Sequence, residues 1–64
     1  MCQMSVVHKQ QDQEEVVAEN ASLLEVEGNG VKISTLFEET RQIDGVAVSS
    51  IDFLAGKVIL TNKL

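Results

Sequence analysis

The chain has 64 residues, of which 44% are hydrophobic and 23% charged, and its formal net charge is −5 at pH 7. This length allows a single domain over residues 1–64, and the composition is typical of a folded protein and not of a disordered segment. The negative charge argues against a nucleic-acid partner, because phosphate binding depends on Lys and Arg, and no apolar run approaches the length of a membrane span. No secretory signal pattern is present, so we expect a cytoplasmic protein.

The first predicted element is a strand over residues 2–9. Apolar and polar side chains alternate there, so that Cys2, Met4, Val6 and His8 share one face. At a sheet edge this strand would expose apolar side chains that a small monomer cannot cover, so we expect a homodimer that pairs through the N-terminal strand. His8 lies roughly 20 Å from Cys2 along a straight strand, too far for both to bind one ion. We therefore interpret His8 as a half-exposed strand residue.

Alternation between turn signals predicts several further strands. These strands cover residues 15–18, 22–27, 31–37, 46–53 and 57–60, with an extended segment at 41–43. In the strand at 22–27, Leu24 and Val26 are predicted to face the core. Residues 14–24 are also the one stretch where a short helix could lie, because their apolar spacing is ambiguous.

The predicted connections differ in how strongly the sequence marks them. Residues 28–30 read Gly-Asn-Gly, and both residue types tolerate positive φ, which indicates a tight hairpin. Weaker signals place a loop or loose hairpin connection at residues 10–14, a turn at 19–20, an acidic turn at 38–40, a bulge or bend at 44–45, a bend near 49–50 and a last turn at 54–56.

Together these elements predict an all-β domain, a small antiparallel sheet or partly open barrel of five to seven short strands. Phe37 and Phe53, the only aromatic residues, stand in apolar strand contexts, which favours places in the core. Such a chain buries only about 60% of its unfolded surface. Its single cysteine excludes an internal disulfide, so a homodimer, a bound metal or an unusually tight core must add stability, and we expect the dimer.

Cys2 is the candidate functional residue. Its thiolate, the amide nitrogen before it and the α-amino group of Met1, if Met1 is retained, can form chelate rings around one metal ion. Nitrogen and sulfur donors of this kind favour square-planar Ni(II) or Cu(II). A lone cysteine is more often a small buried apolar residue, but chain termini tend to be exposed, which favours the metal-binding interpretation.

Four segments carry a resemblance to a known family. They are MCQMSVV at residues 1–7, VKISTLFEE at 31–39, IDF at 51–53 after Gly45, and GKVIL at 56–60. With them the chain resembles the CooT family over nearly its whole length. Some members of that family are described only as predicted RNA-binding proteins.

The resemblance implies an all-β homodimer that binds Ni(II) through the cysteine following the initiator methionine, here Cys2. It implies a nickel carrier or metallochaperone, possibly for maturation of carbon monoxide dehydrogenase as client nickel enzyme. The alternative is a non-catalytic protein-interaction or RNA-binding module. An enzyme is not expected, because Cys2 and His8 are too far apart to act together and the acidic residues cluster in predicted turns.

Overall fold

The protein is described by a computed structural model that covers residues 4–37 and 39–63. All of its regular structure in these ranges is strand. The six strands are β1 (Met4–Gln10), β2 (Gln13–Glu27), β3 (Gly30–Thr35), β4 (Arg41–Asp44), β5 (Val46–Asp52) and β6 (Lys57–Asn62). The all-β prediction is confirmed, and the stretch where a helix was considered lies within β2. Across the described ranges there is no helix that could span a membrane.

The strands form one sheet in the order β4-β3-β2-β1-β6-β5. Neighbouring strands are antiparallel except β1 and β6, which run parallel, so the sheet is mixed where a purely antiparallel one was expected. The last strand returns to lie beside the first. β1 is therefore an interior strand, paired on both sides, and the prediction that it forms a sheet edge is wrong.

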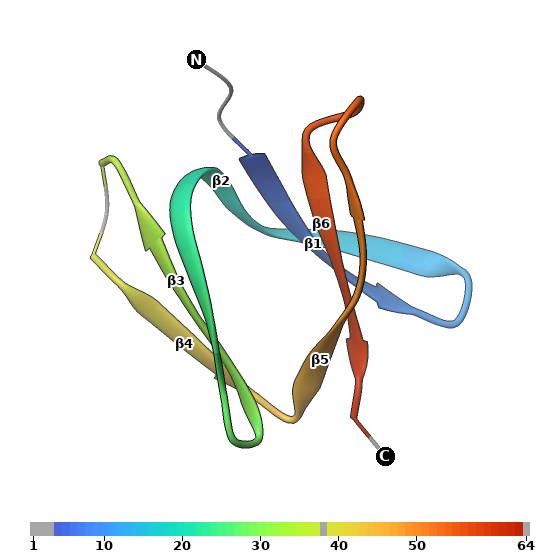
Figure 1. The fold of residues 1–64 in the computed structure, drawn as a ribbon. Helices are drawn as coiled ribbons and strands as arrows, with labels where there is room; N and C mark the ends of the chain where they lie inside the picture. The colour runs from blue at the N-terminus through green and yellow to red at the C-terminus, as the bar shows by residue number, and fades with distance from the viewer. Residues whose placement is uncertain (1–3, 38, 64) are drawn as a thin grey trace.

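The sheet is strongly curled, because its two edge strands are consecutive in the chain. Only Gly45, with φ of 79°, separates β4 from β5. At this corner the Gly45 N–H donates to the carbonyl of Asn29 at 2.7 Å, and the Lys63 N–H donates to the Gly45 carbonyl at 2.9 Å. Figure 1 shows the two halves of the sheet converging on this corner and diverging toward the end where β1 begins. The predicted bend at residues 44–45 is confirmed.

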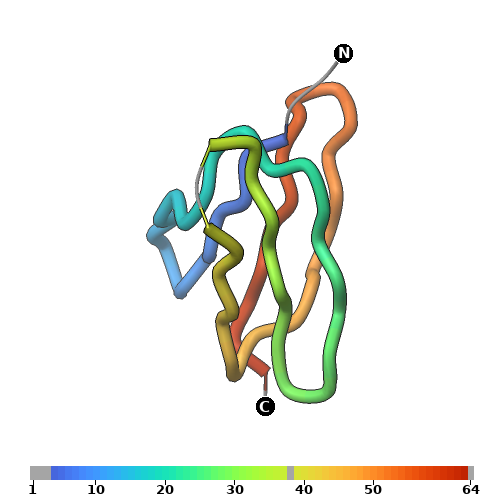
Figure 2. The backbone as a smooth tube through the Cα atoms, turned by 90° about the vertical axis from the view of Figure 1, so that its left-hand side faces the viewer, coloured from blue at the N-terminus to red at the C-terminus, as the bar shows by residue number. Residues whose placement is uncertain are grey.

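β2 joins the two halves of the curled sheet. Its first half pairs with β1 and its second half with β3, with Ala21 opposite both Met4 and Thr35. The prediction of a turn at residues 19–20 is wrong, because the chain does not reverse there and β2 runs unbroken through both residues. Asn20 nevertheless has φ of 60°, and the small buried residues Ala18 and Ala21 lie beside it. The turn signal therefore marks a bend within a strand, which lets β2 wrap around the core (Figure 2).

The core is aliphatic and lies inside the curl. Val6, Val31, Ile33 and Leu60 are the largest fully buried side chains. They pack in one cluster with Ala18, Ala21, Val46 and Val58, and with the half-buried Met4, Val17, Leu24, Ile43 and Val48. Full burial of one such aliphatic side chain contributes about 1.5–3 kcal/mol. Leu24 packs against this core as predicted, but Val26 is 71% exposed because β2 extends beyond the core there.

Two tight hairpins organise the antiparallel pairs. The loop expected over residues 10–14 is a turn of only two residues, with Gln10 opposite Gln13 and Gln11 at φ of 52°. The hairpin predicted at residues 28–30 is confirmed between β2 and β3. Gly28 there has φ of 34°, whereas Gly30 lies so close to β4 that a Cβ would overlap the carbonyl oxygen of Ile43.

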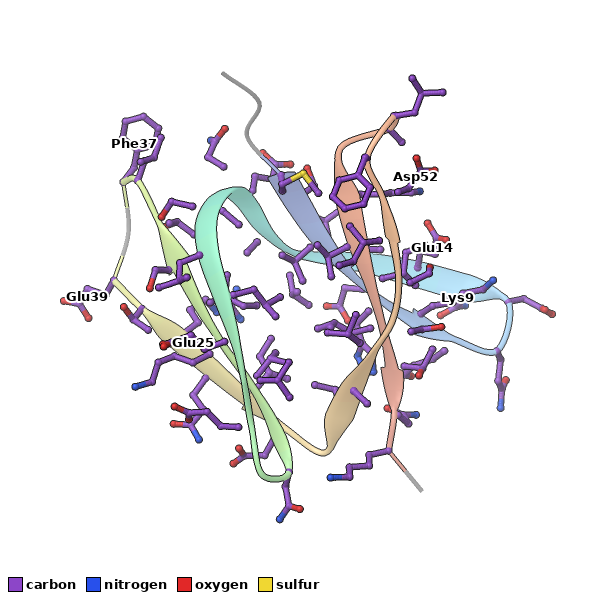
Figure 3. The ribbon with its side chains drawn as sticks, viewed as in Figure 1. Lys9, Glu14, Glu25, Phe37, Glu39 and Asp52 are labelled. Carbon is purple, nitrogen blue, oxygen red and sulfur yellow. The ribbon has the colours of Figure 1, made fainter. Side chains whose placement is uncertain are left out.

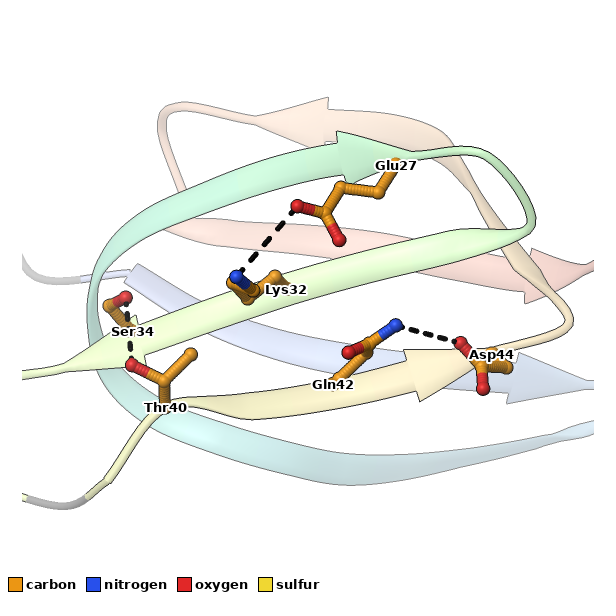
Figure 4. A network of polar contacts seen from close by, with 6 residues as sticks. All are labelled: Glu27, Lys32, Ser34, Thr40, Gln42 and Asp44. Carbon is orange, nitrogen blue, oxygen red and sulfur yellow. Dashed lines mark hydrogen bonds and ion pairs between the residues drawn. The ribbon is translucent and has the colours of Figure 1, made fainter.

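The later connections follow the sequence closely. β5 shows a register shift between Val48 and Ser50, where the bend near residues 49–50 was predicted, and the last turn precedes β6 as expected. Exposed polar side chains of β2, β3 and β4, and of the segment that leads into β4, contact one another on the surface (Figure 4). These contacts comprise the Lys32–Glu27 ion pair at 3.8 Å, the Ser34–Thr40 hydroxyl contact at 3.4 Å and the Gln42–Asp44 hydrogen bond at 3.3 Å.

Candidate functional site

Cys2 and Met1, the predicted metal ligands, lie outside the described residues. The description begins at Met4, where β1 is already held on both sides. Met4 lies opposite Ala21 of β2, and the Ser5 N–H donates to the Gly56 carbonyl at 2.9 Å at the start of β6. In the sequence, Cys2 therefore precedes a firmly anchored interior strand by two residues.

The start of β1 shares one end of the sheet with two connections from distant parts of the chain. Thr35, Ala21 and Met4 lie side by side on β3, β2 and β1, and Lys57 of β6 lies between Ser5 and Asp52. Neighbouring strands are about 4.8 Å apart. The segment after β3 and the β5–β6 turn therefore flank the start of β1, as Figure 1 shows. We call this the N-terminal end of the sheet.

This end carries the most exposed large apolar side chains of the described chain. Phe37 is 78% exposed, Phe53 82% and Leu54 100%, and Leu36 beside Phe37 is 54% exposed. We call these four residues the apolar rim. In Figure 3 Phe37 projects from the segment after β3, at the same end of the molecule as Asp52 and the β5–β6 turn. The prediction that both Phe residues lie in the core is wrong, because Phe53 directly follows β5 and Phe37 lies two residues after the end of β3, so both stand outside the sheet.

Phe53 and Leu54, one half of the apolar rim, lie in the turn between β5 and β6, which hydrogen bonds define. The Gly56 N–H donates to the Asp52 carbonyl at 2.8 Å, and the Ala55 N–H donates to the Asp52 carboxylate at 2.9 Å. Gly56 supplies the positive φ of 73° that the turn requires. Asp52 thus stabilises the turn that presents Phe53 and Leu54 to solvent.

His8 is half-buried in β1, as predicted, and stands apart from the N-terminal end. Its Nε2 lies 2.8 Å from Asn62 Oδ1, and its Nδ1 lies 3.5 Å from Gln10 Nε2. It lies four positions after Met4 in the same strand, about 13 Å along it. Among residues 4–37 and 39–63, no group of three or more His, Cys, Asp or Glu side chains could hold a metal ion.

A pocket of about 400 Å³ lies beside the first half of β2. Val16, Val17, Phe37 and Arg41 contribute to its lining, and the Arg41 guanidinium donates to the Val17 carbonyl. A smaller pocket beside His8 includes Glu14 and Glu15, and Glu14 pairs with Lys57 at 3.5 Å. Glu14 therefore already has a cationic partner on the neighbouring part of the sheet.

The apolar rim is the feature that the sequence reasoning missed. Its signal was present in the order of the residues: Phe37 directly precedes the acidic segment 38–39, and Phe53 and Leu54 directly precede the turn-forming Gly56. That position, and not residue type, indicates exposure here.

Comparison with known proteins adds an independent finding. Residues 1–61 match the profile of a family described as the CO dehydrogenase accessory protein CooT. The fold is similar to the crystal structure of a candidate CooT from Carboxydothermus hydrogenoformans, with a TM-score of 0.86 and 17% identity, over 98% of this chain and 100% of that one. At this identity the structural likeness shows a shared fold. No curated protein matches the sequence.

Proposed function

The chain belongs to the CooT family of CO dehydrogenase accessory proteins, and from that membership we propose that it carries Ni(II) for maturation of carbon monoxide dehydrogenase. The observation that carries the proposal is the family match itself. It spans residues 1–61 and so includes Cys2, the only thiol of the chain. In this proposal the protein delivers a metal and catalyses no reaction.

The Cys2 thiolate is the proposed primary ligand. Backbone nitrogen donors of the N-terminal segment complete chelate rings, including the α-amino group of Met1 if Met1 is retained. Sulfur and nitrogen donors suit square-planar Ni(II). His8 contributes no ligand in this proposal, because it stands about 13 Å further along β1 than Met4.

One thiolate and one amine leave a square-planar ion short of ligands. A second copy of the chain, related by a two-fold axis near the N-termini, supplies an identical set. We therefore propose that the nickel is shared by two Cys2 residues in a homodimer. Both chains then contribute to one metal site.

The test is a calorimetric titration of Ni(II) into the metal-free protein and into the Cys2→Ser variant. We expect one nickel per two native chains, with a thiolate-to-nickel absorption band. The variant loses the band and at least 100-fold in affinity, because a hydroxyl does not replace a soft thiolate donor. Its circular dichroism is expected to stay native, since Cys2 precedes β1 in the sequence and no core residue is changed. Native-like nickel binding by the variant would move the site away from Cys2.

The apolar rim supports a second candidate, a protein-interaction module without metal chemistry. Exposed aromatic and aliphatic side chains at one end of a small domain are typical of a contact surface. Such a module would bind its partner equally well with and without nickel. Partner binding that disappears in the presence of a chelator would instead support the nickel carrier.

A further inference from the structure

We propose that one side of β2 is a docking edge for an extended peptide segment of a partner protein, and that a carboxylate of this segment binds Arg41. The edge consists of residues 13–19 in the first half of β2, which we call the open edge. The inference goes beyond the proposed function, because neither the open edge nor Arg41 takes part in nickel binding in that proposal.

The two halves of β2 are paired differently. Residues 13–16 and Ala18 pair with β1 on one side, whereas β3 pairs with β2 only from Ala21 onward. The open edge therefore has no strand on its β3 side, and Figure 1 shows the β1–β2 hairpin extending away from β3 and β4. Backbone N–H and C=O groups along such an edge are a template for an added strand. Lys and Pro, which often protect a sheet edge, are absent from residues 13–19.

The pocket of about 400 Å³ lies on this open edge. Its lining includes the consecutive residues 16–20 of β2, together with Thr35, Phe37 and Arg41 from the end of β3 to the start of β4. Successive side chains of a strand point to opposite faces, so consecutive residues line one pocket along the edge of a strand and not on one of its faces. The volume is within the range of sites that bind small ligands. The pocket thus provides space for the end of a peptide beside the backbone of β2.

Arg41 supplies the positive charge of this pocket. Its guanidinium donates to the carbonyl of Val17, a residue that the register with β1 skips. A guanidinium has several N–H donors in a planar fork, so donors remain for a carboxylate, a group that this fork fits closely. Glu19 also lines the pocket, but no ion pair joins it to Arg41 in the described part of the chain. Arg41 is therefore available to an anionic ligand.

A backbone contact just past the pocket decides how the peptide lies. The Leu36 N–H donates to the Asn20 carbonyl at 3.3 Å, so the backbone of β2 is already engaged there. An added strand can therefore extend along residues 13–16 but must end in the pocket beside Arg41. A peptide that ends there in a carboxylate complements the guanidinium, whereas one that begins there would place its cationic amino group against it. The peptide thus runs parallel to β2, with its C-terminus in the pocket.

The side chains along the edge indicate the composition of the peptide. Val16 is 55% exposed and Phe37 78% exposed, and both line the pocket. They favour an apolar final residue, since burial of exposed apolar surface stabilises the complex. Glu15 and Glu19 are exposed on the open edge, and the chain carries a net charge of −5. These charges favour Lys or Arg earlier in the peptide.

The test measures binding of synthetic peptides to the metal-free protein by calorimetry, so its result does not depend on nickel. The first probe is a short acetylated peptide of alternating valine and lysine that ends in a valine with a free carboxylate, and the second is the same peptide with a C-terminal amide. We expect the amide to bind at least ~10-fold more weakly, because it lacks the charge-assisted contact with Arg41. Equal binding of the two peptides would overturn the inference. A third probe, amidated and ending in glutamate, would support a side-chain carboxylate as the source of the contact if it binds as tightly as the free acid.

Two variants test the role of Arg41. Arg41→Gln removes the guanidinium, and Lys32→Gln is the matched control, because it removes one positive charge from β3 outside the pocket, where Lys32 pairs with Glu27. We expect Arg41→Gln to bind the free acid at least ~10-fold more weakly and to lose the preference over the amide, whereas the control keeps both. Circular dichroism confirms that each variant is folded. Free-acid binding of native strength by Arg41→Gln would overturn the inference.

Amide hydrogen exchange locates the bound peptide. We expect amides among residues 13–16 to exchange ~10-fold more slowly when the free acid is bound, because an added strand pairs with N–H groups of the open edge. The outer strand β5 serves as the internal control, since its free edge lies elsewhere in the sheet. Protection confined to β5, or no binding of the free acid at millimolar concentration, would overturn the inference.

Discussion

At Gly30 the backbones of β3 and β4 approach each other so closely that no side chain fits between them. A Cβ there would overlap the Ile43 carbonyl oxygen and lie 2.8 Å from the Cα of Asp44. The obstacle is backbone, so relief requires β4 to move away from β3. We predict that Gly30→Ala lowers the free energy of unfolding by about 3 kcal/mol or prevents folding.

Gly28, in the same hairpin, is the control for this prediction. Nothing lies within 4 Å of a Cβ at Gly28, and its φ of 34° is the only difficulty. Gly28→Ala should therefore cost only about 1 kcal/mol. Urea unfolding of both variants decides the matter, and equal losses at the two positions would contradict the close approach of β3 and β4.

Among the elements, β2 holds the fold together, since it pairs with β1 along its first half and with β3 along its second. Its bend depends on Asn20 at φ of 60°, a conformation that Asn tolerates and β-branched residues avoid. We predict that Asn20→Val destabilises the protein by about 1–2 kcal/mol and that Asn20→Gly is nearly neutral. Thermal unfolding measures both, and a Val variant as stable as the Gly variant would show that the bend does not need positive φ.

Local signals were sufficient to predict most elements. Gly28 and Gly30 marked the hairpin, Gly45 the corner, and Ser49 and Ser50 the irregular point of β5, because turn chemistry is a property of neighbouring residues. The pairing of β6 with β1 could not be predicted, since it joins residues 52 positions apart, such as Ser5 and Lys57, and depends on the curl of the whole sheet. Asn20 favours a turn, but the pairing of β2 with β1 and with β3 makes it a bend within the strand.

The metal chemistry expected at Cys2 stays a prediction, because Cys2 lies outside the described residues, whereas the setting expected for the strand that follows it was wrong. Cys2 stood out because of its residue type and its position in the sequence. The alternation of apolar and polar side chains predicted a strand there, and that strand was expected at the edge of the sheet. Whether β1 is an edge strand is decided by β6, whose residues lie 52 positions after their partners in β1. Phe37 and Phe53 were misplaced for a related reason: apolar neighbours predict a strand, but not the residue at which the strand ends.

At the scale of the whole molecule, the two ends of the sheet differ in character. One end is closed by polar contacts: Lys63 donates through its Nζ to the Gly28 carbonyl at 2.8 Å, and its backbone N–H bonds to Gly45. The other end presents the apolar rim around the start of β1. The molecule is thus closed at the C-terminal corner and offers its apolar surface beside the segment that contains Cys2.

The central claim is that this protein hands nickel to carbon monoxide dehydrogenase through Cys2. Its most direct test supplies nickel-free carbon monoxide dehydrogenase with nickel-loaded protein in the presence of a chelator that captures free nickel. The account predicts that the native protein restores enzyme activity under the chelator, whereas Cys2→Ser protein mixed with the same amount of nickel does not. Equal restoration by the two proteins, or none by the native protein after it is shown to hold nickel, would contradict the account.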